Sequence, residues 1–216
     1  MWEVADVIPT REEMKATLVL RQGKELTEKC ESVTVAICGL GGLGSNIAIA
    51  LARAGIGKLI LIDFDKVDVT NLHRQQYKAS QVGMHKTEAL RDNLLEIAPY
   101  IQLETHTLKL TEENLTDVLQ EADIICEAFD KAEEKAMLVN TVLEKLSQKY
   151  LIAASGMAGL ASANSIKTRQ ITKHFYLCGD ESSDVADGMG LVAPRVMLCA
   201  AHQAHMVLRI LAGKEE

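Results

Sequence analysis

The sequence predicts an α/β protein with a Rossmann-like three-layer fold, in which a mostly parallel sheet is continued by antiparallel strands. Short apolar, β-prone segments alternate with helical segments along most of the 216 residues, a pattern typical of βαβ units and a parallel sheet. The first unit carries a glycine cluster between its strand and its helix. Near the carboxyl end, two β-prone segments follow each other without a helix between them, which favours an antiparallel pair.

A helical segment precedes the sheet, and a long helix follows it. Residues 10–31 are expected to form one or two helices that begin with a capping box at Thr10 and Glu13. The C-terminal helix is expected over residues 194–211, with Pro194 near its first turn.

The first βαβ unit predicts a phosphate site. Residues 33–38 form an apolar strand, and residues 47–54 form an apolar helix that Gly55 ends. Glycines let the backbone approach a phosphate closely, and the start of a helix offers an anion unpaired N–H groups and a positive dipole end. The glycines between strand and helix have the spacing G-x-G-x-x-G with one extra member: Gly39, Gly41, Gly42 and Gly44.

The second strand, residues 58–62, ends in Asp63. This aspartate follows the glycines by about twenty residues, where Rossmann-type domains place a ribose-binding carboxylate. The complete order of strand, glycines, helix, strand and aspartate is far more specific for a nucleotide than the glycine spacing alone. A glycine turn that only packs helix against strand is the alternative.

The residues beyond Asp63 favour a polyphosphate. A polar loop over residues 66–81 precedes a helix expected over residues 83–98. Cations and an amide beyond the ribose carboxylate suit a triphosphate whose α–β bond is to be broken, whereas a dehydrogenase needs few cations there. A lysine in the first turn of a helix also opposes the helix dipole unless an anion is near. The residues concerned are Asp65, Asn71, Arg74, Gln75 and Lys86.

A second acidic residue ends another strand. Residues 123–129 are expected to form a buried strand that ends at Asp130. A carboxylate beside ATP is electrostatically tolerable when a cation lies between them, so contact with Mg²⁺ is its expected role. The alternative is an N-cap for the helix expected over residues 131–145.

The remaining elements complete the predicted sheet. Strands are expected over residues 101–106, 150–154, 162–168 and 175–178, and a short helix over residues 111–120 with Thr111 as its cap. Ser155 and Gly156 then lie in a turn of small residues, which either contacts a substrate tail or only packs.

The motifs GLGGLG, D-x-D-x-V, N-L-x-R-Q and G-x-x-K, with Asp130 later in the chain, resemble the adenylating domain of the ThiF/MoeB/HesA family, which is related to the ubiquitin-activating enzymes. The resemblance runs from about Glu28 to Gly213 and is greatest to the short ThiF-like branch of thiamine biosynthesis. It implies one adenylating domain over residues 1–216 that uses ATP and Mg²⁺. The implied reaction is adenylylation of the C-terminal Gly-Gly carboxylate of a small ubiquitin-like sulfur-carrier protein.

The resemblance also implies a homodimer and a role for each candidate residue. Asp63 binds the ribose, Asp130 positions Mg²⁺, and Asp65 and Gln75 support them. An N-terminal arginine reaches the phosphates, for which Arg21 is favoured over Arg11. The implied catalytic residues are Arg74, Lys86, Asp130 and Arg21, and the implied nucleotide-binding residues are Gly39, Gly41, Gly42, Gly44, Asp63, Asp65, Asn71, Arg74, Gln75 and Lys86.

Two features depart from the family pattern. Longer relatives carry two C-x-x-C pairs that bind a structural zinc; here Cys178 alone is near that place, so no structural zinc is expected. The loop over residues 179–190 lacks the cysteine of thioester-forming relatives, so adenylation is expected while a covalent step is in doubt. His202 and His205 are three apart on the last helix, and packing is favoured over metal binding for them.

Composition limits the alternatives. A net charge of −7 disfavours nucleic acid as a main partner, and no apolar run approaches the ~20 residues of a membrane span. An acidic N-terminus unlike a signal peptide and five cysteines without close pairing favour a cytoplasmic protein. The competing hypotheses are an NAD(P)-dependent oxidoreductase, a non-catalytic nucleotide-binding scaffold and, less favoured, ATP-driven dehydration of a tRNA base.

Overall fold

The computed structural model describes residues 8–188 and 190–214. The described residues form a seven-stranded sheet with the order β3-β2-β1-β4-β5-β7-β6. Neighbouring strands are parallel except β6 and β7, which are antiparallel. The predicted fold class is therefore confirmed. The strands are β1 (Thr34–Cys38), β2 (Lys58–Ile62), β3 (Gln102–His106), β4 (Ile124–Glu127), β5 (Tyr150–Ala154), β6 (Lys167–Thr172) and β7 (Phe175–Gly179).

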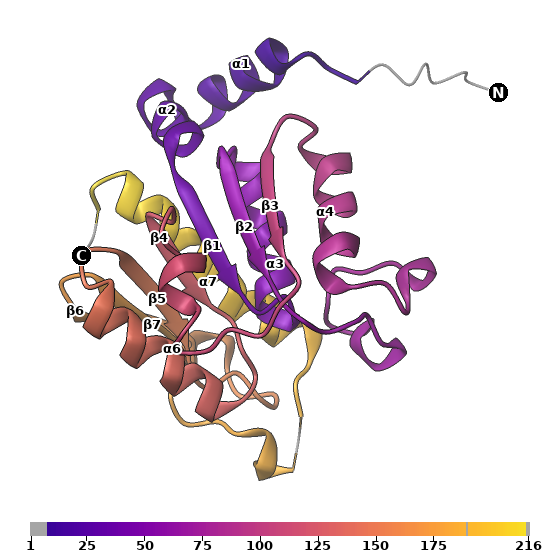
Figure 1. Cartoon of the computed structure of the whole chain (residues 1–216), viewed down its shortest axis with the longest axis vertical. Helices are drawn as coiled ribbons and strands as arrows, with labels where there is room; N and C mark the ends of the chain where they lie inside the picture. The colour runs from indigo at the N-terminus through magenta and orange to yellow at the C-terminus, as the bar shows by residue number, and fades with distance from the viewer. Residues whose placement is uncertain (1–7, 189, 215–216) are drawn as a thin grey trace.

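Helices cover both faces of this sheet. Helices α3, α4 and α7 pack on one face, and α5 and α6 pack on the other; α6 lies in front of the sheet in Figure 1, with α3 and α7 behind it. Helices α1 and α2 lie near the amino ends of the strands (Figure 1). The helices are α1 (Arg11–Gln22), α2 (Lys24–Ser32), α3 (Gly42–Ala54), α4 (Lys86–Ile97), α5 (Leu115–Val118), α6 (Ala132–Lys145) and α7 (Ala193–Leu211).

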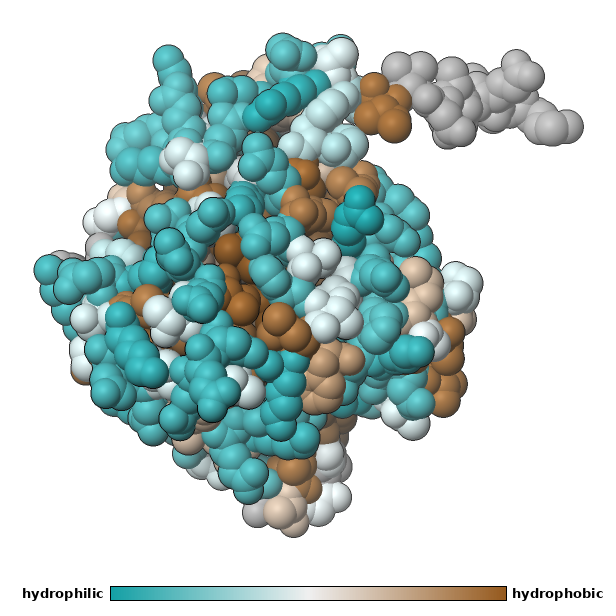
Figure 2. Space-filling view, in the orientation of Figure 1, coloured by the Kyte–Doolittle hydropathy of each residue, from teal (hydrophilic) through white to brown (hydrophobic). Residues whose placement is uncertain are grey.

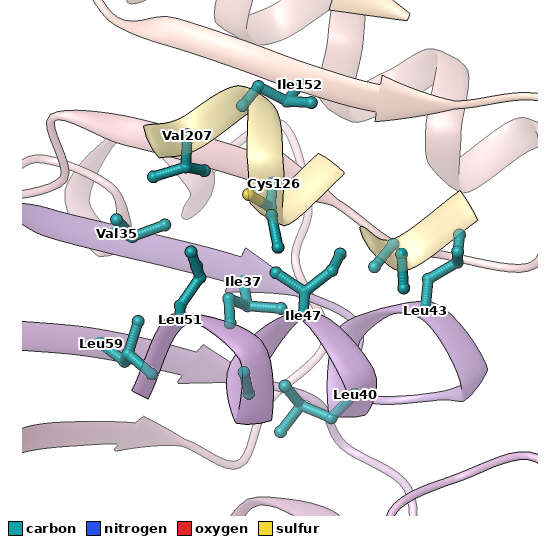
Figure 3. Packing of buried hydrophobic residues seen from close by; sticks show 14 of the residues in the cluster. Val35, Ile37, Leu40, Leu43, Ile47, Leu51, Leu59, Cys126, Ile152 and Val207 are labelled. Carbon is teal, nitrogen blue, oxygen red and sulfur yellow. The ribbon is translucent and has the colours of Figure 1, made fainter. Parts of the chain in front are cut away.

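Each face of the sheet has its own apolar core, because successive residues of a strand point to opposite faces. Ile37 of β1 packs with Leu51 of α3 and Val207 of α7 (Figure 3). Ala36, the preceding residue of β1, lies with Leu138 of α6 in the second core. The central strands are therefore apolar at nearly all positions, with Thr34, Lys58 and Glu127 at their ends. Cys38 and Cys126 are fully buried.

The sheet has a topological switch point between β1 and β4, where the side on which successive strands are added changes. After β1 the chain proceeds to β2 and β3 on one side, and it then returns to place β4 on the other side of β1. Open α/β sheets bind ligands at the carboxyl ends of strands beside such a switch point. The predicted glycine turn follows β1, and Asp130 follows β4, so both lie beside it.

Several element boundaries differ from the predictions. Helix α3 already begins at Gly42, because its first turn tolerates the glycines. Helix α4 begins at Lys86 rather than residue 83, because Gly83 has a φ of +92° and His85 forms an isolated antiparallel β-bridge with Lys66. Strand β6 covers residues 167–172 rather than 162–168, because the Ser162 side chain caps a 3₁₀ turn over residues 163–165.

Helix α5 also differs in its cap. The predicted cap, Thr111, instead donates its backbone N–H to Asn114 Oδ1 at 2.8 Å, and Asn114 is the N-cap residue. By contrast, the predicted capping box of Thr10 and Glu13 is present at the start of α1. Pro194 lies in the first turn of α7, also as predicted.

Within residues 8–188 and 190–214, none of the helices has the combination of length and apolar composition that spanning a lipid bilayer requires.

The core between α3 and the sheet is expected to dominate stability. Leu51 is fully buried between α3 and β1, so Leu51→Ala should lower the free energy of unfolding by about 2–5 kcal/mol. Urea denaturation followed by circular dichroism measures this change. Leu20→Ala is the matched control, because Leu20 is 79% exposed and its truncation should change stability by no more than about 0.5 kcal/mol. Equal losses in the two variants would contradict this account of the core.

Candidate active site

The glycines in the turn after β1 differ in how much space surrounds them. Gly39 has a φ of +91°, and a Cβ there would lie 2.8 Å from the Ala128 carbonyl oxygen. A Cβ at Gly44 would overlap the carbonyl oxygen of Gly39. These two glycines serve close packing, as the alternative interpretation of the turn expects. Gly41 is different, because a Cβ there would meet only Gln75 Nε2, at 3.7 Å.

Helix α3 begins at this turn without a side-chain cap. Gly41 is its N-cap residue and has no side-chain oxygen to accept a hydrogen bond from the first N–H groups. Those N–H groups and the helix dipole favour an anion at the turn. Helix α7 closes over the same place, since a Cβ at Gly42 would lie 2.9 Å from Val196 Cγ1 and 3.5 Å from Arg74 Cγ.

Asp63 holds the glycine turn from the neighbouring strand. Its Oδ2 accepts the Leu40 N–H at 2.7 Å, and its Oδ1 accepts the Asp65 N–H at 2.8 Å. The side chain is only 8% exposed. Burial raises the pKa of Asp63, and the positive charge of Lys86 and these two N–H groups oppose that rise. The carboxylate therefore lies directly beside the expected phosphate site.

Lys86 forms an ion pair with each aspartate of the D-x-D segment. Its Nζ is 2.8 Å from Asp65 Oδ2 and 3.7 Å from Asp63 Oδ2, and its side chain is 8% exposed. The lysine that begins α4 is thus compensated by carboxylates rather than left facing the helix dipole. Sequence reasoning placed Lys86 at the phosphates and did not anticipate these two ion pairs.

The N-L-H-R-Q segment lies against the first turn of α3. Asn46 Nδ2 donates to the Gly42 carbonyl at 2.7 Å and to the Arg74 carbonyl at 3.2 Å. Asn71 Oδ1 accepts the Asp68 N–H at 3.0 Å, so that amide helps to form the loop. These contacts fix the backbone of Arg74 next to Gly42.

Two polar atoms of this segment lack partners among the described residues. Arg74 Nη1 donates to the Thr70 carbonyl at 3.3 Å, but the buried Nε has no acceptor. Gln75 is 7% exposed, and its buried Oε1 has no donor. Buried polar atoms are rarely left unpaired in folded proteins. A Cβ at Gly41 would lie 3.7 Å from Gln75 Nε2, and a Cβ at Gly42 would lie 3.6 Å from Arg74 Cδ, so both side chains border the start of α3.

Asp130 lies in the loop after β4, which packs on the glycine turn. A Cβ at Gly39 would lie 3.0 Å from Phe129 Cδ1. Buried Glu127 forms this loop by accepting the Phe129 N–H at 2.7 Å and pairing with Lys135 at 3.0 Å. Asp130 itself is exposed. Its predicted alternative role as an N-cap is wrong, because Lys131 is the N-cap residue of α6 and provides no side-chain cap.

The structure does not bring Arg21 or Arg11 to these residues. Both belong to α1, which lies at the amino ends of β1, β2 and β3. Gln22, next to Arg21, donates to the Ala54 carbonyl at the far end of α3. The 13-residue helix α3 separates that end from the glycine turn by about 20 Å, given a rise of about 1.5 Å per residue.

Sequence reasoning missed the residues that support the turn. Tyr77 donates its hydroxyl to the Leu40 carbonyl at 2.7 Å, and Gln76 Nε2 donates to Asn46 Oδ1 at 2.7 Å. The only signal for Asn46 was an amide in an otherwise apolar helical run. The role of Tyr77 depends on a contact between distant parts of the chain, which no local pattern reports.

The described residues contain no cluster of three or more histidine, cysteine or acidic side chains that suits a metal ion. His202 lies against the sheet edge, where its Nδ1 is 3.0 Å from Thr168 Oγ1. Any Mg²⁺ at Asp130 would therefore take its other ligands from substrate phosphates and water, as this ion commonly does. An exposed carboxylate beside the glycine turn fits that arrangement.

The amino-acid sequence matches a known family over most of its length. The sequence model of the ThiF family matches residues 15–216. This chain belongs to the ThiF family. The predicted resemblance is therefore confirmed.

Curated relatives are longer than this ThiF-family chain. The adenylyltransferase and sulfurtransferase UBA4 of Lodderomyces elongisporus is 30% identical over 193 residues, which are 86% of this chain and 42% of that protein. The ubiquitin-like modifier-activating enzyme 5 of Caenorhabditis briggsae is 45% identical over 91 residues, which are 42% of this chain and 21% of that protein. The chain thus spans less than half the length of these relatives.

Solved structures share the fold. The E. coli tRNA N6-threonylcarbamoyladenosine dehydratase TcdA, solved in complex with ATP, has a TM-score of 0.86 at 20% identity and covers 96% of this chain and 98% of its own. E. coli MccB, solved with AMPCPP and MccA, has a TM-score of 0.67 at 25% identity and covers 88% of this chain and 59% of its own.

Lys86 should stabilise the site in a pH-dependent manner. Lys86→Met leaves two carboxylates without their cation, which should cost about 3–5 kcal/mol at pH 7.5. The substitution removes the main influence that lowers the pKa of Asp63, so this pKa should rise further above its usual 3.8. The folded state then binds a proton more readily than the unfolded state, and stability falls as pH rises through the raised pKa.

The deficit of Lys86→Met relative to wild type should therefore be larger at pH 7.5 than at pH 4.5, as measured by urea denaturation. Lys29→Met is the control, because the Lys29–Glu25 pair lies on the surface and should contribute less than about 1 kcal/mol at either pH. An equal deficit for Lys86→Met at both pH values would contradict the assigned ion pairs.

Proposed function

We propose that this ThiF-family chain uses ATP to adenylylate the C-terminal Gly-Gly carboxylate of a small ubiquitin-like sulfur-carrier protein. The observation that supports this most directly is the gathering of unlike groups at the switch point of the sheet. An uncapped helix start and a buried acid paired with a lysine lie at the glycine turn, and the loop that carries the exposed Asp130 packs on this turn through Phe129.

Each group has a role in binding MgATP. The first N–H groups of α3 bind the phosphates, and the Asp63 carboxylate accepts hydrogen bonds from the ribose hydroxyls. Arg74 Nε and Gln75 Oε1 obtain the partners that they lack among the described residues. Asp130 holds the magnesium ion, which supplies positive charge to the phosphates when bound.

The reaction requires no nucleophile from this chain. An oxygen of the carrier carboxylate attacks the α-phosphorus and forms a new P–O bond. The bond from the α-phosphorus to the oxygen bridging it to the β-phosphate breaks, and pyrophosphate leaves with that electron pair. The products are an acyl-adenylate and pyrophosphate. Alignment of the reactants and stabilisation of charge on the leaving group by Arg74 and Lys86 account for the acceleration.

Two observations support the choice of a sulfur-carrier protein as substrate: the kinds of enzyme that the chain is similar to, and its resemblance to the ThiF-like branch. The similar proteins include a ubiquitin-like modifier-activating enzyme and an adenylyltransferase and sulfurtransferase. The resemblance to the ThiF-like branch favours thiamine thiazole biosynthesis as the pathway. The N-terminal arginines lie too far from the turn to serve their own nucleotide, so Arg21 would act from a second copy in a homodimer.

Carrier-dependent exchange of pyrophosphate into ATP is the direct test. Wild-type protein with a recombinant Gly-Gly-ending carrier should catalyse the exchange. Arg74→Ala and Asp130→Asn should each lower the exchange rate by about 10²–10³-fold, as expected when one charge-stabilising group is lost. Arg91→Ala is the control, because this arginine is exposed on α4 and should retain wild-type exchange. Normal exchange by Arg74→Ala would contradict the role assigned to this arginine, whereas carrier binding without any exchange by wild type would favour a scaffold over an enzyme.

Ligand-induced stabilisation separates the proposal from an oxidoreductase. MgATP at about 100 times its dissociation constant should stabilise the folded protein by about 2.7 kcal/mol. That is a rise of roughly 5–10 °C in Tm for a domain of this size, whereas the same concentration of NAD should produce little rise. Differential scanning fluorimetry measures both, with Asp63→Asn as a variant that should lose the response to MgATP. A larger shift with NAD than with MgATP would reject the proposal.

A further inference from the structure

The carboxyl edge of the sheet has a second half that the nucleotide groups do not use. The glycine turn, Asp63 and Asp130 follow β1, β2 and β4. The next two strands in the sheet are β5 and β7; the loop after β5 consists mostly of small residues, and the loop after β7 contains Asp180 and Glu181. These two segments, residues 155–165 and residues 179–183, are here called the tail loops.

Arg195 joins the tail loops from the first turn of α7. It is 5% exposed. Its Nε donates to the Ala158 carbonyl at 3.1 Å, and its Nη1 donates to the carbonyls of Ala161 and Ser162 at 2.9 and 3.0 Å. Its Nη2 donates to Ser165 Oγ at 3.1 Å and to the Asp180 carboxylate. Every donor of the guanidinium fork therefore has an acceptor in one of the two loops.

Asp180 is the buried counterion of Arg195, with a side chain 4% exposed. Its Oδ1 accepts the N–H groups of Ser182 and Ser183 at 3.0 and 2.8 Å. Burial acts to raise the pKa of Asp180, but these N–H groups and Arg195 outweigh it and hold the pKa below the usual range. The carboxylate is thus ionised and shared between its own loop and α7.

The two tail loops also interlock through glycines. A Cβ at Gly179 would overlap the Ser155 carbonyl oxygen, and one at Gly156 would overlap Asp180 Oδ1. Glu181 has a φ of +56°, in the left-handed region, and its N–H donates to the Ser155 carbonyl at 3.0 Å. The loops therefore have a single closely fitted arrangement, which depends on the charged pair at its centre.

The position of the tail loops suits the acyl substrate. Ser155 directly follows β5, the parallel neighbour of the strand that leads to Asp130. Arg74 and Lys86 belong to the segments that follow β2, and β2 lies on the opposite side of β1 from β4 and β5. In the proposed reaction, pyrophosphate therefore leaves toward β1 and β2. An in-line attack on the α-phosphorus must then come from the side of β5 and β7. A Gly-Gly tail has no side chains, so its recognition requires backbone groups held at fixed positions.

We propose that the Arg195–Asp180 ion pair holds the tail loops in the shape that receives the carrier tail, which makes Arg195 a positioning residue for the acyl substrate. This inference rests on the proposed function. A buried ion pair is weak evidence for added stability, because removing two charges from water offsets much of their attraction. Its effect here is to fix one conformation of two loops in which Met157 is the large side chain that reaches the core.

The test compares Arg195→Gln and Asp180→Asn with wild type in carrier-dependent pyrophosphate exchange. Both variants should raise the KM for a recombinant Gly-Gly-ending carrier at least tenfold. The KM for ATP, and the Kd for MgATP measured by calorimetry, should stay within twofold of wild type. If Arg195→Gln does not fold, Asp180→Asn carries the test, because its amide oxygen still accepts the serine N–H groups. Unchanged carrier KM, or equal rises for carrier and ATP, would overturn the inference.

Arg169→Gln is the matched control. Arg169 pairs with Glu181 of the same loop, but both side chains are exposed, at 57% and 41%, so its loss should change carrier KM less than twofold. A tenfold effect of this variant would assign the behaviour to the loop surface rather than to the buried pair, and would also overturn the inference.

Hydrogen–deuterium exchange keeps this inference separate from the proposed function. If wild type shows no exchange of pyrophosphate into ATP with any Gly-Gly-ending carrier, the proposed function fails. Arg195→Gln should still speed amide exchange in residues 156–165 at least tenfold, with α3 and β1 unchanged, if the pair holds the tail loops. Unaltered protection of residues 156–165 would overturn the positioning role whatever the carrier result.

Discussion

The site depends on how one buried carboxylate holds the glycine turn. Asp63 accepts N–H groups from Leu40 of the turn and from Asp65 of the following loop, so it ties the ends of β1 and β2 together. An ionised group that is buried to this degree needs a cation, and Lys86 supplies it from the start of α4. The turn, both loops and α4 therefore share one electrostatic centre. The glycine turn is held by Asp63 and not by a side-chain cap at the start of α3. The first N–H groups of α3 therefore remain open to an anion.

Helix α7 completes the site from the far end of the chain. Its first turn places Val196 against Gly42 and Arg195 among the tail loops, while further along it Gln203 donates to the Glu127 carbonyl at 2.9 Å. One helix thus contacts the turn after β1, the strand leading to Asp130 and the loops after β5 and β7. Its apolar stripe packs with α3 in the same core (Figure 3). In the space-filling view, polar residues cover most of the opposite face, over α6 (Figure 2).

Local sequence patterns predicted the features that depend mainly on residues near one another in the chain. The apolar strands, the glycine turn and the aspartate at the end of β2 follow from residue type and spacing, and they are where the sequence placed them. The sequence did not reveal that Lys86 is bound by Asp65, because a lysine in a first turn looks the same whether its partner is a phosphate or a carboxylate. Tyr77, Asn46 and Arg195 were missed for another reason. Their hydrogen bonds join segments distant in sequence, and no periodicity reports such pairs.

The balance of charge at the site supports the proposal that a second copy of the chain contributes a cation to the reaction. Lys86 is already shared by two carboxylates, Lys135 by Glu127, and Arg195 by Asp180. Arg74 has no acidic partner among the described residues. In the proposed reaction, the triphosphate would interact with Arg74, with Lys86 in competition with its two carboxylates, with the start of α3 and with one magnesium ion. A further cation would offset more of its charge. The arginines of α1 lie at the opposite edge of their own chain, so under the proposed function they would come from a second copy.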